Sequence, residues 1–240
     1  YIYKNKGHMD ELTSYRPIAL TSTFVNILKT MMLKRVFKVL SPQLHHSQGG
    51  YRVGSGAREQ LWAMLEFLED GESSESPTTF CTTDAHKAFD QVYRAGTLYL
   101  LYGHGIRGKM LHMISLWITN NFAVQTWRGH TGNRVVLDEN GLRQGCVLSP
   151  LLYLVIINSL VAEEPSVQMP DWDLNFRARA YCQGVQPLYS MDGLGDWLVF
   201  LFVDDTAFVA NAPSTMDLML ERYENFTQFW RIRINPSKCK

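Results

Sequence analysis

The chain lacks an excess of charge of either sign, and it lacks an apolar run long enough to cross a membrane. Its 23 Lys and Arg residues balance its 23 Asp and Glu residues, whereas a nucleic-acid-binding surface usually carries a basic stripe. The longest apolar run, 147–161, is interrupted by Ser149, Pro150, Asn158 and Ser159 and falls short of the roughly 20 residues of a membrane span. We therefore expect a buried helix there and no membrane partner.

Cysteine is also scarce. Cys81, Cys146, Cys182 and Cys239 stand singly, with no CxxC pair, which argues against a zinc site and a disulfide framework and favours a reducing compartment. No signal peptide opens the sequence, which begins with Tyr1 rather than Met. We interpret the chain as an excerpt from a longer intracellular protein.

The charges that are present are unevenly distributed. Apolar residues make up 46% of the chain and charged residues 19%, a composition typical of folded globular proteins. The charged residues among the first 40 are mainly basic, whereas acidic residues cluster in 66–75 and 163–173. Net charge therefore does not decide whether the chain binds nucleic acid.

Hydrophobic periodicity predicts a mixture of helices and strands. Helices are expected at 22–40, 57–68, 93–101, 109–119, after 149–150 and at 214–230, strands at 78–83, 122–127, 134–137, 197–203 and 206–211, and loops at 71–77 and 163–196. Because strands and helices do not alternate strictly, α+β is the expected fold class.

Two adjacent carboxylates, Asp204 and Asp205, separate two strongly apolar strands. An ordinary hairpin turn would explain them, since Asp is a favoured turn residue. However, two-residue hairpins prefer Asn-Gly or Asp-Gly, and two like charges in a dry setting are unfavourable. Divalent cations such as Mg²⁺ or Mn²⁺, which take oxygen ligands, would remove that repulsion. The segment thus leaves a turn and a metal site open.

A third carboxylate, Asp84, also follows a predicted strand. On its own it suits the N-cap of a helix. Two-metal phosphoryl transfer needs several carboxylates from different strands at one point. A metal-binding role for Asp84 is therefore favoured when Asp84 is considered together with Asp204 and Asp205.

The segment 141–151 places a polar stretch between Gly141 and Gly145 just before a predicted helix. Free backbone N–H groups at such a point suit close approach by a phosphate or a base. The alternative is a plain loop and helix start with Pro150 near its first position.

These segments, in this order, resemble reverse transcriptases, most closely those of non-LTR (LINE-type) retrotransposons. The matching segments are Tyr-Arg-Pro-Ile-Ala-Leu at 15–20, Gln-Gly-Gly-Tyr-Arg at 48–52, Asp-Ala-His-Lys-Ala-Phe-Asp at 84–90, 141–150, Phe-Val-Asp-Asp at 202–205 and Ile-Asn-Pro-Ser-Lys at 234–238. Each motif alone is weak, but together they span nearly the whole chain. The resemblance implies a right-hand polymerase, with fingers at 1–77 and an antiparallel palm sheet within 78–240. The palm would hold a helical insertion at about 91–120 and stop before the thumb.

The resemblance also implies an activity, RNA-directed DNA polymerisation by nucleotidyl transfer from a dNTP to a primer 3′-hydroxyl on an RNA template. Two Mg²⁺ or Mn²⁺ ions would bind at Asp84, Asp204 and Asp205, with Asp204 the firmer ligand of the pair. Lys238 would protonate the pyrophosphate leaving group. The substrate-binding residues implied are Lys4, Lys6, Arg16, Arg52, Phe89, Gln144 and Gly145. Among these, Phe89 would exclude a ribose 2′-hydroxyl.

Several alternatives stay open. A group II intron maturase and a telomerase-like enzyme share the pattern, whereas RNA-templated RNA polymerases usually have Gly before the Asp pair and Asp at the position of Phe89. Val203, His86 and Gly49 depart from the family pattern, which leaves room for a decayed, catalytically silent copy. We expect an RNA template, a DNA primer, fusion of the parent protein to retroelement domains such as an endonuclease, and a nuclear location.

Overall fold

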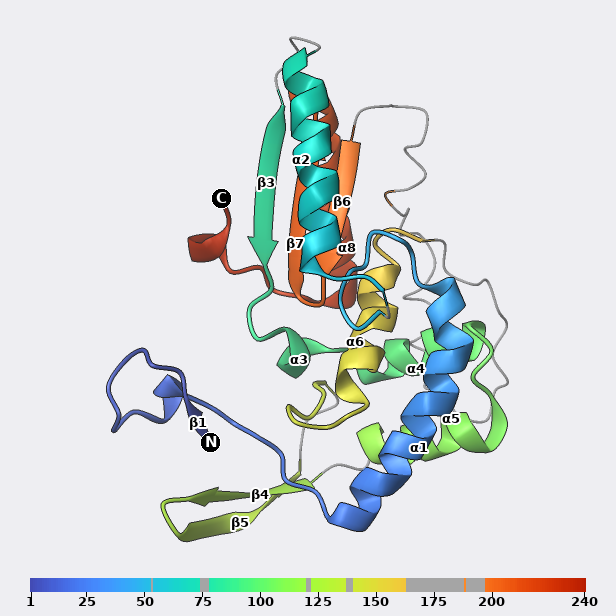
Figure 1. Ribbon diagram of the computed structural model, residues 1–240. Coiled ribbons are helices and arrows are strands. Elements are labelled where there is room, and N and C mark those ends of the chain that lie inside the picture. Colours follow the sequence, from blue (N-terminus) through green and yellow to red (C-terminus); the bar gives the residue numbers. More distant parts are fainter. Residues whose placement is uncertain (53, 74–77, 120–121, 137–139, 163–187, 189–196) are drawn as a thin grey trace.

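A three-stranded antiparallel sheet forms one half of the fold. In the computed structural model, which describes residues 1–52, 54–73, 78–119, 122–136, 140–162, 188 and 197–240, its strands are β3 (Thr79–Asp84), β7 (Asp205–Ala210) and β6 (Trp197–Phe202), in the order β3-β7-β6. The helix α2 (Ala57–Ser73) lies over one face and α8 (Pro213–Trp230) over the other (Figure 1).

The helix α8 covers the sheet because its apolar residues recur at helical spacing. Its buried residues are Met216, Met219, Tyr223, Phe226, Thr227 and Trp230, a period that forms one continuous stripe. Pro213 sits in the first turn, where no backbone N–H is needed, and Arg231 ends the helix in the left-handed conformation with φ 56°. Local sequence therefore determines the buried face of this helix and favours its start at Pro213.

The other half of the fold is helical. The helices are α1 (Thr23–Leu40), α4 (Arg94–Gly103), α5 (Gly108–Thr119), α6 (Ser149–Asn158) and the short α3 (Ala88–Gln91). Ser22 caps α1 by accepting a hydrogen bond from the Val25 N–H at 3.4 Å. The helix α6 is apolar all round and is buried from Leu151 to Asn158, which confirms the buried helix expected in 147–161.

Two small hairpins pack against each other beside this core. They are β1 (Ile2–Tyr3) with β2 (Tyr15–Arg16), and β4 (Phe122–Trp127) with β5 (His130–Val136). Trp127 contacts the rings of Tyr1 and Tyr15 at centroid distances of 5.2 and 4.6 Å, and such edge-to-face pairs stabilise beyond their buried area. Short 3₁₀ turns lie at Leu12–Ser14, Ser41–Gln43 and Pro236–Lys238.

The mixed helices and antiparallel strands confirm the α+β class, but some expected boundaries are wrong. The loop expected from residue 71 begins later, because α2 continues to Ser73. The end of α2 contains Gly71. The free-energy cost of a glycine in a helix is smaller than the stabilisation that a helix gains from packing on a sheet. The connection between β4 and β5 is a tight turn at Arg128 and Gly129, both with positive φ, rather than a longer link. The loop expected at 163–196 lies outside the described residues except for Leu188.

None of the helices in the described part of the chain is both long enough and apolar enough to cross a bilayer.

Gly96 allows α4 to lie against α8, and its replacement should be destabilising. A Cβ at this position would lie 2.5 Å from the Trp230 ring and 2.9 Å from the Tyr93 ring, and Trp230 is fully buried. Overpacking of this kind costs about 1–3 kcal/mol. We expect Gly96→Ala to lower the free energy of unfolding by that amount in urea titrations.

Gly132→Ala is the matched control for this substitution. Its Cβ would meet only the Gln125 carbonyl oxygen at 3.6 Å, so a change within about 0.5 kcal/mol is expected. Equal stability of the Gly96→Ala variant and the unsubstituted chain would contradict the close packing of α4 on Trp230.

Candidate active site

The register between β3 and β7 brings the two halves of the acidic site together. Asp84, the last residue of β3, is the direct cross-strand partner of Asp205, the first residue of β7. Side chains that face each other in this way have Cβ atoms about 4.5–5.5 Å apart. Asp204 precedes Asp205 in the turn, so the three carboxylates gather at one end of the sheet. Asp84 therefore ends a strand and does not cap a helix.

The three carboxylates influence one another electrostatically. Partial burial raises the pKa of Asp205, the charges of Asp204 and Asp84 raise it further, and Lys238 lowers it. The pKa of Tyr153 lies well above its usual range, first because the residue is buried and then because all three carboxylates are near. The acids thus form one negatively charged cluster over Tyr153.

The turn that carries Asp204 is strained. Val203, at the first turn position between β6 and β7, has φ 62°, a conformation that is rare and costly for a β-branched residue. The buried Gln48 holds the turn, since its side-chain Oε1 accepts hydrogen bonds from the N–H groups of Gly50 at 2.8 Å and Val203 at 3.3 Å. Gly50 leaves room for Val203, because a Cβ there would lie 2.7 Å from the valine side chain.

Gln48 is a site residue that the motif analysis did not single out. In the sequence, Gln48 is marked by its place as the first residue of the Gln-Gly-Gly-Tyr-Arg segment at 48–52. Nearby, Gln60 donates to the carbonyl oxygens of Ser47 at 2.7 Å and Leu201 at 2.8 Å. These bonds attach the segment 47–50 to β6, and so to the turn.

Lys238 provides the cation at the acidic cluster. Its Nζ lies 3.0 Å from Oδ1 and 2.9 Å from Oδ2 of Asp84. The backbone next to it runs along β3, with the Asn235 N–H donating to the Asp84 carbonyl at 2.9 Å and the Lys240 N–H donating to the Thr82 carbonyl at 3.2 Å. The end of the chain is thereby held beside the carboxylates.

Tyr153 lies between Phe89 and the acidic cluster, since its ring contacts Phe89 and its hydroxyl lies near the carboxylates. The two rings pack at a centroid distance of 5.3 Å, and Phe89 is half-buried while Tyr153 is buried. The Tyr153 hydroxyl has no hydrogen-bond partner among the described residues. Phe89 is thus supported from below by a rigid aromatic ring, with part of its own surface open to a ligand.

The loop that carries Gln144 and Gly145 lies between the N-terminal segment and the segment of Phe89. Gly145, with φ 93°, packs so closely that a Cβ would lie 3.1 Å from the Ile18 side chain, and the Ala19 N–H donates to the Gln144 carbonyl at 2.8 Å. On the other side, the Gln144 side chain donates to Asp90 at 3.4 Å. The loop therefore joins the Arg16 segment to the Phe89 segment.

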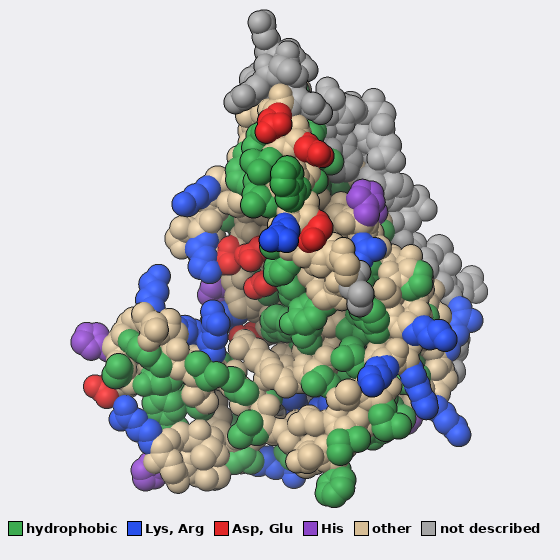
Figure 2. Space-filling model, in the orientation of Figure 1, with side chains coloured by type: hydrophobic (Ala, Val, Ile, Leu, Met, Phe, Trp, Pro, Cys, Tyr) green, Lys and Arg blue, Asp and Glu red, His purple; other side chains and the backbone are tan. Residues whose placement is uncertain are grey.

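The remaining candidates lie farther along this surface. Arg16 is exposed at the end of β2, and Lys4 and Lys6 are exposed near β1. Arg52 donates to the His45 carbonyl at 2.7 Å, which ties its guanidinium to its own loop. Acidic side chains gather at the end of the sheet, with basic side chains close by toward the N-terminal segment (Figure 2).

The donor set suits a divalent cation in chemistry, although the side chains do not yet enclose one. Carboxylate oxygens are the ligands that Mg²⁺ and Mn²⁺ prefer, and a cation would relieve the carboxylate repulsion that, after burial, raises the pKa of Asp205. Within the described residues, however, no three Asp, Glu, His or Cys side chains lie close enough to hold an ion as they stand. Asp84 is instead paired with Lys238.

Comparison with known proteins gives consistent relatives. The family model described as reverse transcriptase (RNA-dependent DNA polymerase) matches residues 2–240. The RNA-directed DNA polymerase from mobile element jockey of Drosophila melanogaster is 22% identical over 251 residues, covering 99% of this chain and 24% of that protein. The Pol polyprotein from type-1 retrotransposable element R2 of Nasonia vitripennis is 21% identical, covering 99% and 21%. The chain thus spans less than a quarter of the length of these relatives.

Among solved structures, the apo telomerase from Candida tropicalis is similar, with a TM-score of 0.62, 11% sequence identity, and coverage of 90% of this chain and 36% of that one. At this identity, the likeness shows a shared fold.

The raised pKa of Asp205 predicts that its charge destabilises the chain without metal. A carboxyl whose pKa is higher in the folded state stabilises fully below its unfolded pKa, about 3.9, and this contribution is lost as pH rises through the folded pKa. Asp205→Asn should therefore raise the melting temperature at pH 7 in EDTA, by an amount that shrinks toward pH 4. Thermal unfolding monitored by circular dichroism measures it.

Asp217→Asn, which changes an exposed carboxylate on α8, is the control and should give no such pH-dependent gain. A lower melting temperature for Asp205→Asn at pH 7, or a gain independent of pH, would contradict the cost of charging this partly buried carboxylate beside Asp204 and Asp84.

Proposed function

Because the chain belongs to the reverse transcriptase (RNA-dependent DNA polymerase) family, we propose that it forms the polymerase core of a LINE-type retrotransposon protein. It joins a deoxynucleoside triphosphate to the 3′-hydroxyl of a primer paired to an RNA template. The observation that carries the proposal is the meeting of Asp84, Asp204 and Asp205 at one end of the sheet. Nucleotidyl transfer needs such a cluster of carboxylates from different strands.

Dependence on divalent metal is general in this family, and we assign the ligands here to Asp84, Asp204 and Asp205. Two Mg²⁺ or Mn²⁺ ions, when bound, lower the pKa of the primer hydroxyl and neutralise charge on the triphosphate. The strained turn at Val203 places Asp204 directly before Asp205, so that both carboxylates lie at the end of the sheet near Asp84. Asp205 contributes negative charge through its place beside Asp84.

The residues around the acids have separate roles in this proposal. Lys238, whose ammonium already lies at Asp84, donates a proton to the pyrophosphate as it leaves. Phe89, resting on Tyr153, blocks the space of a ribose 2′-hydroxyl. Gln144 and Gly145 line the nucleotide and template pocket.

Three basic residues of the N-terminal segment complete the nucleotide site. Arg16 holds the triphosphate by its planar fork, and Lys4 or Lys6 adds a point charge. The hydrogen bond from Ala19 to Gln144 supports this role, because it ties the Arg16 segment to the nucleotide loop. Arg52 supports the site indirectly, through the loop 45–52.

In the same proposal, residues 1–77 form the fingers and 78–240 the palm, with the insertion at about 91–120. The parent protein works in the nucleus and carries further retroelement domains such as an endonuclease. Its thumb would supply phosphate contacts to the primer-template duplex, and the balanced charge of this chain offers little to replace them.

Loss of one carboxylate should abolish synthesis. In the full-length protein, Asp204→Asn keeps the shape of the turn and removes a metal ligand, so primer extension with dNTPs and Mg²⁺ should fall by about 10³-fold or more. Asp217→Asn, on the exposed side of α8, should extend primers normally. Extension by the Asp204→Asn variant at more than about a tenth of the wild-type rate would refute the assignment.

Sugar selection should depend on Phe89. Phe89→Ala opens space beside the nucleotide sugar, so the ratio of ribonucleotide to deoxyribonucleotide incorporation should rise by about tenfold or more, because steric exclusion is removed while metal binding is kept. Single-nucleotide incorporation in the full-length protein, with each nucleotide type at several concentrations, gives this ratio. Phe122→Ala, which removes an exposed ring of the β4–β5 hairpin, serves as the control. An unchanged ratio in Phe89→Ala would mean that this ring is only part of the core.

A further inference from the structure

The hydroxyl of Tyr153 is a buried polar group that the proposed polymerase chemistry does not use. Tyr153 lies in the middle of α6 with 1% of its surface exposed, and its hydroxyl has no hydrogen-bond partner within the described residues. A buried hydroxyl without a partner is unfavourable, and most buried polar groups of folded proteins are paired. Any state of the site that supplies an acceptor to this hydroxyl is therefore favoured.

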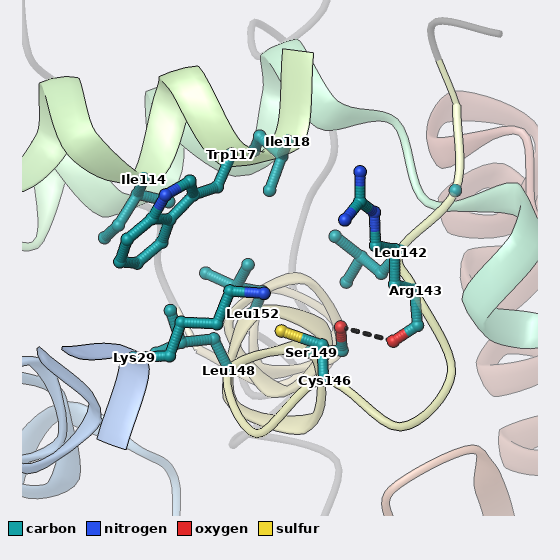
Figure 3. A pocket seen from close by; sticks show the side chains of 11 residues that line it. Lys29, Ile114, Trp117, Ile118, Leu142, Arg143, Cys146, Leu148, Ser149 and Leu152 are labelled. Atoms are coloured by element: carbon teal, nitrogen blue, oxygen red, sulfur yellow. Dashed lines mark hydrogen bonds between the residues drawn. The ribbon is translucent and has the colours of Figure 1, made fainter. Parts of the chain in front are cut away.

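The helix that carries Tyr153 is fixed at both ends. At its start, the Ser149 hydroxyl donates to the Arg143 carbonyl at 2.8 Å (Figure 3). At its end, the Asn158 side-chain oxygen accepts a hydrogen bond from the His45 N–H at 2.7 Å. Because the helix is held in this way and the tyrosine side chain is enclosed, the hydroxyl cannot turn out to solvent.

The C-terminal end of α6 lies near the turn that joins β6 to β7 (Figure 1). The segment 45–47 connects the two, since His45 is bonded to α6 and the Ser47 carbonyl accepts a hydrogen bond from the Leu201 N–H of β6 at 2.9 Å. The helix is thereby attached to the end of the sheet at which the acids gather.

The three carboxylates of the active site lie within electrostatic reach of the Tyr153 hydroxyl. The pKa of Tyr153 is raised first by burial and then by the nearby charges, among which Asp204 has a larger influence than Asp205 or Asp84. A phenol, with an ordinary pKa of about 10, keeps its proton at neutral pH and can donate a hydrogen bond, whereas a carboxylate only accepts. The unpaired donor and these acceptors are therefore complementary.

We propose, on the basis of the proposed polymerase function, that Tyr153 is a positioning residue of the acidic site. Its hydroxyl donates a hydrogen bond to Asp204, directly or through one bound water, when a divalent cation is bound at the cluster. The bond fixes the orientation of that carboxylate toward the cation, and hydrogen bonds to charged groups are stronger than those between neutral groups. Groups that orient metal ligands in this way strengthen metal binding by about 10–100-fold.

Tyr153→Phe tests the proposal, because it removes the hydroxyl and keeps the ring. Binding of Mn²⁺ to the 240-residue chain is measured from the electron paramagnetic resonance signal of the free ion. The dissociation constant should rise about tenfold in Tyr153→Phe. The melting temperature in EDTA should be no lower than that of the unsubstituted chain, because the substitution breaks no existing hydrogen bond. A purely structural role would give the opposite pair of results.

Tyr223→Phe is the matched control. Tyr223 is also buried, with 3% of its surface exposed, but its hydroxyl lies near Thr83 and Thr206 rather than near the carboxylates. This variant should bind Mn²⁺ as the unsubstituted chain does. Equal weakening of Mn²⁺ binding in the two tyrosine variants would overturn the proposal.

Sugar selection separates the hydroxyl of Tyr153 from its ring. In the full-length protein, Tyr153→Phe should leave the ratio of ribonucleotide to deoxyribonucleotide incorporation unchanged, because the ring that packs on Phe89 remains. A changed ratio with unchanged Mn²⁺ binding would mean that Tyr153 acts through Phe89, and this would overturn the proposed contact with the acids.

Asp204→Asn distinguishes this inference from the function on which it rests. This variant should lose Mn²⁺ binding, since it removes a ligand. If Asp204→Asn loses binding while Tyr153→Phe stays within about twofold of the unsubstituted chain, the role of Tyr153 is overturned and the ligand assignment stands. If neither substitution changes Mn²⁺ binding, both are overturned.

Discussion

The antiparallel register between β3 and β7 is the constraint on which the acidic site depends. It sets Asp84 opposite Asp205, and the two residues come from segments that are remote in the sequence. Because successive side chains of a strand point to opposite faces, a slip of one residue would turn one carboxylate away from the other. The packing of α8 against β7 and of α2 against β6 holds this register, so much of the buried core serves to keep the acids in place.

The site concentrates features that oppose folding. Three carboxylates share one end of the sheet, Val203 takes a left-handed conformation, and the buried Tyr153 hydroxyl has no hydrogen-bond partner in the part of the chain that the structure describes. Such features persist only where the surrounding structure supports them. Gln48 supports the turn from one side and Lys238 balances Asp84 from the other.

The walls of the site come from three distant parts of the chain that meet through backbone contacts. Gly145 packs on Ile18, the Ala19 N–H bonds to Gln144, and the Leu142 N–H donates to the Phe89 carbonyl at 2.6 Å. These contacts involve glycine and main-chain atoms, so they depend little on side-chain identity.

Local patterns in the sequence determined much of this protein. The 3.6-residue period located α1, α4, α5 and α8 to within a few residues, because an amphipathic helix records its buried face in its own sequence. The ordered motifs indicated the family and named Asp84, Asp204 and Asp205 as candidates. What the sequence could not show were long-range relations. The pairing of Asp84 with Asp205, the support of Val203 by Gln48, the contact of Lys238 with Asp84 and the packing of Tyr153 on Phe89 each join residues that are far apart along the chain. Sequence periodicity is a local property, whereas strand register and side-chain burial are decided by packing between distant segments, and for that reason only the tertiary structure revealed them.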